Sequence, residues 1–171
     1  PGNVRQRLIK YHNRKKSHEE EITSQLHDHL IIIGFGINGH NVARTANKAN
    51  IPYVAVELDP DIFRDARAEG YPVIYGDAAD ELILHHMHAH EARVVVIAIS
   101  DPEATKKIIT ILRQITETAH VIVRTRHVNE IDEILKLGAD EVIPEEFETS
   151  IQIFTRVLNR YLIPYDKIQS F

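Results

Sequence analysis

The sequence predicts an α/β protein with a doubly wound parallel sheet in the strand order 3-2-1-4-5-6. Short apolar runs alternate with helix-forming segments at intervals of about 20 residues, which is typical of successive β-α units. The run at 93–99, RVVVIAI, is almost wholly apolar, as expected of a central strand that helices cover on both faces. Right-handed crossovers then favour this strand order, with the ligand crevice where the first and fourth strands diverge.

Each element has its own signal in the chain. Apolar runs predict the six strands, at 30–33, 53–56, 72–75, 93–99, 121–125 and 141–144. Three helices are expected to begin at an aspartate that caps the first turn, at Asp59, Asp80 and Asp101, and a proline follows two of them. The remaining helices are expected at 41–50, 130–137 and 147–162.

The first strand runs directly into GFGING at 34–39, a G-x-G-x-x-G pattern. Gly34 permits a sharp turn, Gly36 leaves room for a phosphate, and Gly39 lets the next helix pack on the strand. The start of that helix presents free N–H groups to an anion. Glu57 ends the second strand, where it can accept hydrogen bonds from ribose hydroxyls and would repel the 2′-phosphate of NADP. A Rossmann-like nucleotide-binding domain is therefore predicted, and the alternative is a fold of this type whose ligand site has decayed.

Further polar groups fall at the carboxyl ends of the predicted strands. Ligands of doubly wound sheets bind at this edge. The residues that converge there are Gly36, Glu57, Asp77, Ser100 and Arg124. Their convergence strengthens the nucleotide interpretation more than any one of them does alone.

Composition excludes several classes of function. The chain of 171 residues is 43% hydrophobic, which is enough for a core, and it has no cysteine for a disulfide, a zinc-thiolate site or thiol catalysis. The net charge is −5, but the first 18 residues carry six basic and no acidic side chains, so the remainder carries −11. The globular part is thus a poor candidate for binding nucleic acid.

Three segments are expected. Residues 1–25 are polar and basic, which suits a linker or a juxtamembrane connector on the cytoplasmic side, with a DNA-binding arm as a third option. Residues 26–146 form the nucleotide-binding domain, and residues 147–171 form a C-terminal dimerisation helix and tail. Two apolar stripes run along the last helix, one at Phe147, Ile151, Phe154 and Leu158 and the other at Ile153, Val157 and Tyr161. A second stripe predicts a homodimer, and deep burial within one domain is the alternative.

A histidine cluster, HHMHAH at 85–90, is a candidate zinc site. His86 and His90 are four residues apart, which on a helix would bring their imidazoles to one face. However, the helix is expected to end near Met87, so the spacing need not be helical. Surface histidines without a ligand, adventitious metal capture and a response to pH remain as alternatives.

The motifs together resemble one family over Leu30 to Leu162. They are HLIIIGFGINGHNVAR, VELDP, YGDAAD, RVVVIAISDPEAT and VIVRTRHVNEIDEILKLGADEVIPEEFETS. The chain is similar to RCK or KTN domains of the TrkA-N type, and within them to the C-terminal cytoplasmic domain of Kef-type monovalent cation:proton antiporters. The resemblance implies a regulatory domain, dimeric or in a larger ring, that senses an adenine nucleotide and acts on a preceding membrane transporter domain.

The resemblance also implies the ligand contacts. The phosphates would lie against Gly34, Phe35, Gly36, Ile37, Asn38 and Gly39. Glu57, followed by Leu58, would hold the ribose, Asp77 and Ala78 would lie by the adenine, and Ser100 and Arg124 would flank the phosphates. AMP is the first expectation because a mononucleotide needs fewer contacts, while NAD(H), ADP and ATP stay open.

Two departures from the family pattern affect the ligand. Ile37 and Asn38 occupy positions where many Kef-type members have an arginine. Either Arg124 or Arg126 supplies the missing charge, or the ligand carries less negative charge. These arginines also resemble a basic site for glutathione, but two arginines are too few to assign it.

An NAD-dependent oxidoreductase would need a substrate domain, and a redox-sensing transcription regulator would need a helix-turn-helix. The nucleotide fold takes up almost the whole sequence, so a non-enzymatic regulatory domain is favoured over these two alternatives.

Overall fold

The computed structural model describes residues 18–161, which form one six-stranded parallel sheet and its helices. The strand order is β3-β2-β1-β4-β5-β6, which confirms the predicted doubly wound topology. The strands are β1 (Leu30–Ile33), β2 (Tyr53–Glu57), β3 (Val73–Tyr75), β4 (Val94–Ile97), β5 (His120–Thr125) and β6 (Glu141–Pro144).

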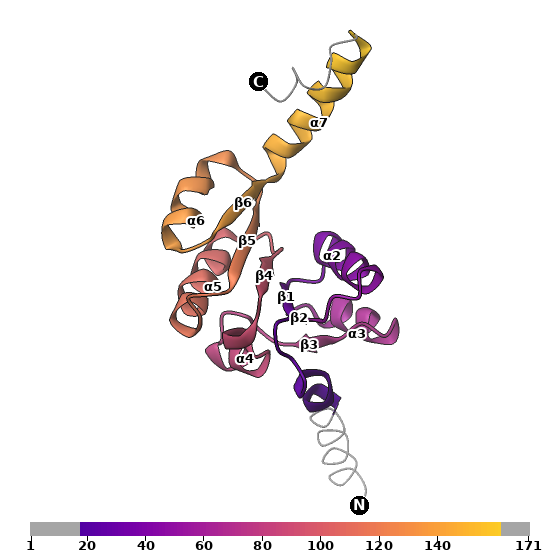
Figure 1. Ribbon diagram of the computed structural model, residues 1–171, viewed down its shortest axis with the longest axis vertical. Helices are drawn as coiled ribbons and strands as arrows, with labels where there is room; N and C mark the ends of the chain where they lie inside the picture. The colour runs from indigo at the N-terminus through magenta and orange to yellow at the C-terminus, as the bar shows by residue number, and fades with distance from the viewer. Residues whose placement is uncertain (1–17, 162–171) are drawn as a thin grey trace, which may run out of the picture.

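The helices that follow β1 are α2 (Ile37–Lys48), α3 (Pro60–Ala68), α4 (Glu81–His86), α5 (Pro102–Ile115), α6 (Ile131–Leu137) and α7 (Glu145–Arg160), with short 3-10 turns at Ala89–Glu91 and Val128–Glu130. Five of these helices connect consecutive strands; α2 and α3 cover one face of the sheet, and α4, α5 and α6 cover the other (Figure 1). Helix α2 begins at Ile37, four residues before the predicted start, because the chain becomes helical directly after Gly36.

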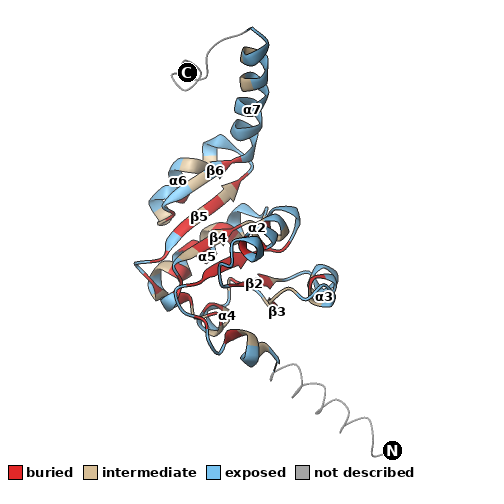
Figure 2. Ribbon diagram, turned by 45° about the vertical axis from the view of Figure 1, so that its right-hand side comes forward, coloured by how far each residue is buried: buried red, intermediate tan, exposed pale blue. Residues whose placement is uncertain are grey.

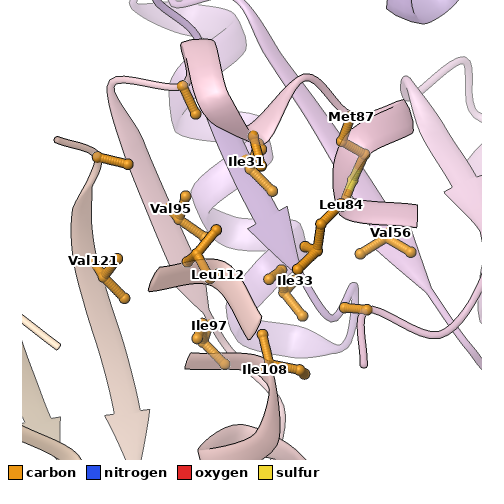
Figure 3. Packing of buried hydrophobic residues seen from close by; sticks show 14 of the residues in the cluster. Ile31, Ile33, Val56, Leu84, Met87, Val95, Ile97, Ile108, Leu112 and Val121 are labelled. Carbon is orange, nitrogen blue, oxygen red and sulfur yellow. The ribbon is translucent and has the colours of Figure 1, made fainter. Parts of the chain in front are cut away.

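Two apolar clusters lie on opposite faces of the sheet, and the side chains of β1 alternate between them. Leu30 and Ile32 pack with Ala43 of α2 and Ala66 of α3. Ile31 and Ile33 point the other way and pack with residues of α4 and α5, among them Leu84 and Leu112 (Figure 3). Ile134 of α6 belongs to the same cluster. Since β1 lies between β2 and β4 and is covered on both faces, it is the centre of the fold.

The predicted aspartate caps are confirmed. Asp59 accepts hydrogen bonds from the N–H groups of the first turn of α3, and Asp101 does the same for α5. Asp80 accepts one such bond from Leu82 at the start of α4. These caps fix where each helix leaves the carboxyl edge of the sheet.

Helix α7 extends away from the sheet, and none of its residues is buried (Figure 2). The alternative that this helix is buried deep within one domain is therefore wrong. Most residues of both predicted stripes are exposed, from Val157 at 42% to Tyr161 at 76%.

The ends of the chain are described only in part. The first 17 residues of the predicted connector and residues 162–171 of the predicted tail lie outside the described range. Residues 18–23 are helical, and Thr23 and Leu26 are buried, so the end of the predicted connector is held against the domain. Between residues 18 and 161, no helix combines the length and the apolar character needed to cross a membrane.

Candidate functional site

The glycine turn brings β1 and α2 into close contact. Gly39, in the first turn of α2, lies so close to Gly34 that a Cβ atom on it would be 1.9 Å from the Gly34 carbonyl oxygen. Gly34 has a φ of +91°, and a Cβ atom there would be 2.8 Å from the side chain of Ile99. At Gly36, by contrast, a Cβ atom would meet nothing within 4 Å. Two of the glycines are therefore required for packing, while the third borders open space.

Glu57 joins the glycine turn to the loop that follows β2. One carboxylate oxygen accepts the backbone N–H of Phe35 at 2.7 Å, and the other accepts the N–H groups of Leu58 and Asp59, each also at 2.7 Å. The side chain is therefore held in place before any ligand arrives. A carboxylate offers about four acceptor positions, so it can also accept a bond from a ribose hydroxyl.

A cavity of about 520 Å³ lies beside Glu57, where β1 and β4 diverge. Its apolar wall includes Ile33, Val56 and Ile108. Six residues that the sequence predicted for a nucleotide site line it together: Gly34, Glu57, Leu58, Asp77, Ala78 and Ser100. Ligand pockets of doubly wound folds form at this topological switch point.

The other predicted residues lie around this cavity. Phe35, Gly36 and Ile37 line a separate cavity of about 330 Å³ on the α3 side of the glycine turn. Asn38 and Gly39 belong to the first turn of α2, and neither lines any of the cavities described here.

Arg124 lies one strand further along, at the end of β5. It lines a cavity of about 190 Å³ that also includes Ser100 and Arg126. Its Nη1 donates to the Ser100 hydroxyl at 3.1 Å, and its Nη2 forms an ion pair with Glu145. Arg124 therefore contacts both Ser100 and an acidic partner, Glu145.

The charge of the 520 Å³ cavity is negative. Four carboxylates line it, from Glu57, Asp59, Asp77 and Asp101, whereas its lining contains no lysine or arginine. Asp59 and Asp101 cap helices, and Asp77 accepts the backbone N–H of Ala79 at 2.8 Å. Because these carboxylates are fixed by backbone donors, the cavity suits a base and a ribose better than a chain of phosphates.

Sequence reasoning did not assign Asp59, Asp101 or Ile99 to the site, although all three line the cavity. The aspartates carried a usable signal. Each aspartate follows a strand and directly precedes the proline that begins the next helix. Its capping role therefore also places it on the ligand edge of the sheet. Ile99 had no comparable signal, because its proximity to Gly34 depends on the pairing of β1 with β4.

The zinc prediction for His86 and His90 receives no support. Helix α4 ends at His86, and His88 adopts a left-handed conformation with φ 54° before the next turn begins. The two histidines therefore do not share a helix face. Within residues 18–161, no group of three or more histidine, aspartate or glutamate side chains is placed to hold a metal ion.

The topology and the glycine turn define a Rossmann-like domain of the kind that binds nucleotides at its switch point. The chain belongs to the TrkA-N domain family, whose sequence profile matches residues 30–145.

Relatives in sequence are potassium antiporters of much greater length. A protein assigned as the K(+) efflux antiporter KefB of Alkalimonas amylolytica is 33% identical over 143 residues, which is 84% of this chain and 22% of that protein. K(+) efflux antiporter 2, chloroplastic, of Arabidopsis thaliana is 32% identical over 149 residues, which is 87% of this chain and 13% of that protein. The chain thus spans less than a quarter of either relative.

Solved structures share the fold at lower identity. The TrkA-N domain of the inner membrane protein ybaL from Escherichia coli has a TM-score of 0.73 at 22% identity, covering 77% of this chain and 97% of that one. The Kef C-terminal domain of Shewanella denitrificans in its AMP-bound form has a TM-score of 0.69 at 21% identity, covering 82% and 85%. The GsuK channel bound to NAD has a TM-score of 0.65 at 22% identity, covering 81% and 23%.

Proposed function

We propose that this chain is the ligand-sensing regulatory domain of a transporter for potassium or another monovalent cation, and that it lies on the cytoplasmic side of the membrane. In this proposal it binds an adenine nucleotide at the glycine turn. The observation that carries the proposal is the Glu57 carboxylate, which is fixed between the glycine turn and the β2–α3 loop beside the 520 Å³ cavity. The antiporter relatives support the transporter context, because this chain matches only 22% and 13% of their lengths, as one domain of a larger transporter would.

The proposed ligand lies across the end of β1. Its ribose hydroxyls bind Glu57, and its adenine lies between Leu58 and the segment Asp77–Ala78. Its phosphate lies between the first backbone N–H groups of α2, whose partial positive charge attracts an anion, and Ser100, to which Arg124 donates. The open space beside Gly36 is what this pose requires.

Among adenine nucleotides we propose AMP. The lining of the cavity contains four carboxylates and no basic side chain, and AMP brings less negative charge to it than ADP or ATP. The AMP-bound Kef domain is consistent with this choice. NAD is the second candidate, because the GsuK channel of the same fold binds it.

We further propose that the signal leaves through α7 and a second copy of the chain. The two exposed apolar stripes of α7 are more than one helix needs to pack on its own domain. A nucleotide regulates such a dimer only when it binds one arrangement better than the other, since equal affinity for both shifts nothing.

A binding role is favoured over an enzymatic one. The described part of the chain from β1 to β6 is one sheet with its helices, and the sheet's ligand edge carries no second domain that would present a substrate to a nicotinamide. We therefore propose no chemical step for this domain.

Calorimetric titration of the purified, nucleotide-stripped protein with AMP, ADP, ATP, NAD⁺ and NADH tests the proposal. We expect micromolar binding of AMP, and a loss of at least tenfold in the variant Glu57→Ala because one or two ribose hydrogen bonds disappear. Glu117→Ala, which removes an exposed carboxylate from the turn between α5 and β5, is the matched control. Failure of all five nucleotides to bind would overturn the proposal.

A further inference from the structure

Helix α7 is held to the domain by few contacts. It follows Pro144 without a side-chain cap, and none of its residues is buried. At its first residue, Glu145 forms an ion pair with Arg124. Next to it, the backbone N–H of Glu146 lies 3.4 Å from the Arg126 carbonyl oxygen. In the described part of the chain, Arg124 is therefore one of two side chains of the domain that form an ion pair with the first turn of α7; the other is His127, whose Nδ1 lies 3.6 Å from a carboxylate oxygen of Glu146.

The same arginine reaches the wall of the nucleotide cavity. Its Nη1 donates to the hydroxyl of Ser100, and Ser100 lines both the 520 Å³ cavity and the adjoining 190 Å³ cavity. The Arg124 side chain is only 17% exposed, and its Nε is buried with no hydrogen-bond partner. The guanidinium thus has an unused donor while it is shared between the cavity wall and α7.

We propose that Ser100, Arg124 and Glu145 form a link through which nucleotide binding controls the direction of α7. The link rests on the function proposed above. When a ligand phosphate enters, it competes with Glu145 for the Arg124 guanidinium. A phosphate monoester carries up to two negative charges and three acceptor oxygens, so it is a stronger partner than one carboxylate. Its arrival therefore weakens the contact that fixes the start of α7.

Competition of this kind has to act in both directions. If the phosphate weakens the Arg124–Glu145 pair, the pair must weaken phosphate binding by the same factor. Removing the charge of Glu145 is therefore expected to tighten the binding of a phosphate-bearing ligand. It is not expected to affect a ligand that has the same base and ribose but no phosphate.

The test compares AMP with adenosine by calorimetry in the full chain and in the variant Glu145→Gln. A partly exposed ion pair predicts that the variant binds AMP about two- to fivefold more tightly than the parent, with unchanged affinity for adenosine. Glu148→Gln is the control, because it removes the same charge from the same first turn of α7. A second variant, Arg124→Gln, is expected to weaken AMP binding and to leave adenosine binding unchanged.

Each outcome has one meaning. Equal AMP affinity in Glu145→Gln and Glu148→Gln would overturn the link while leaving the nucleotide site intact. A gain of equal size for AMP and adenosine would also overturn it, because the phosphate would then play no part. Absence of AMP binding in the parent would instead overturn the proposed function, and the link with it.

Discussion

The backbone N–H of Phe35 donates to the carboxylate of Glu57 at 2.7 Å, which joins the turn after β1 to the end of β2. Glu57, which is proposed to bind the ribose, therefore also stabilises the glycine turn. Leu58 and Asp59 donate to the same carboxylate, so three backbone donors depend on one side chain.

Replacing Glu57 with alanine is expected to lower the free energy of unfolding as well as nucleotide affinity. The N–H groups of Leu58 and Asp59 lie near solvent and can bind water, but Phe35 is only 4% exposed, so we expect a loss of about 1–3 kcal/mol. Urea denaturation without ligand measures this effect. Glu57→Gln is expected to give a smaller loss, because its amide oxygen can still accept backbone N–H groups on one side while its NH₂ group cannot on the other. An Ala variant as stable as the parent would show that the carboxylate does not hold the turn.

A pair of glycine variants distinguishes packing from ligand access. Gly39→Ala places a Cβ atom 1.9 Å from the Gly34 carbonyl oxygen, so β1 and α2 must separate. We expect destabilisation of about 1–3 kcal/mol, or failure to fold.

Gly36→Ala is the matched change, since its Cβ atom meets nothing within 4 Å and its φ is −65°. We expect its melting temperature to stay within a few degrees of the parent, while AMP affinity falls because the new methyl group occupies the space proposed for the phosphate. Thermal melts and calorimetry on both variants test this pair. Similar stability losses in the two variants would contradict it.

The sheet was predictable because its signals are local. The apolar run of β4 and the aspartate caps of α3, α4 and α5 each lie within a few residues, and right-handed crossovers leave few topologies open. The position of Glu57 at the carboxyl end of β2 followed in the same way from the length of one β-α-β unit.

What the sequence could not predict depends on contacts between distant residues. The pairing of Arg124 with Glu145 requires β5 and the start of α7 to be neighbours, and the segment between them contains a helix and a strand. The zinc prediction receives no support for a local reason, since the left-handed conformation of His88 breaks the helical spacing of His86 and His90. No glycine marks the end of this helix in the sequence, so the sequence could only suggest that the helix ends near Met87.

The free energy of unfolding is expected to decrease as the pH is lowered, because of His29. This side chain is 1% exposed, its Nε2 donates to the Met87 carbonyl oxygen at 2.8 Å, and its buried Nδ1 has no partner. Burial lowers the pKa of His29 below 6.5; the bond to Met87 and the nearby Glu91 oppose this effect, and His88 and His27 add to it.

Below about pH 6.5 the unfolded chain therefore binds a proton at His29 that the folded chain does not, and the free energy of unfolding decreases as pH falls through that range. Chemical denaturation at pH 7.5, 6.5 and 5.5 measures the slope. His29→Gln, which retains a donor for Met87, is expected to flatten it, whereas exposed His90→Gln should leave it unchanged. Identical slopes in the parent and His29→Gln would exclude His29 as the cause.

The exposed stripes of α7 give the last prediction, which concerns the proposed homodimer. Phe154 is 55% exposed in one chain, so Phe154→Glu is expected to leave the fold of the domain intact. In a two-fold interface the same change would bury a carboxylate on each side, which is costly without a partner. Sedimentation equilibrium is therefore expected to show a dimer for the parent and a monomer, or a dimer at least tenfold weaker, for the variant. Gln152→Glu, which adds the same charge to α7 outside both stripes, should remain dimeric. If Phe154→Glu dimerises as tightly as Gln152→Glu, then α7 does not form the interface.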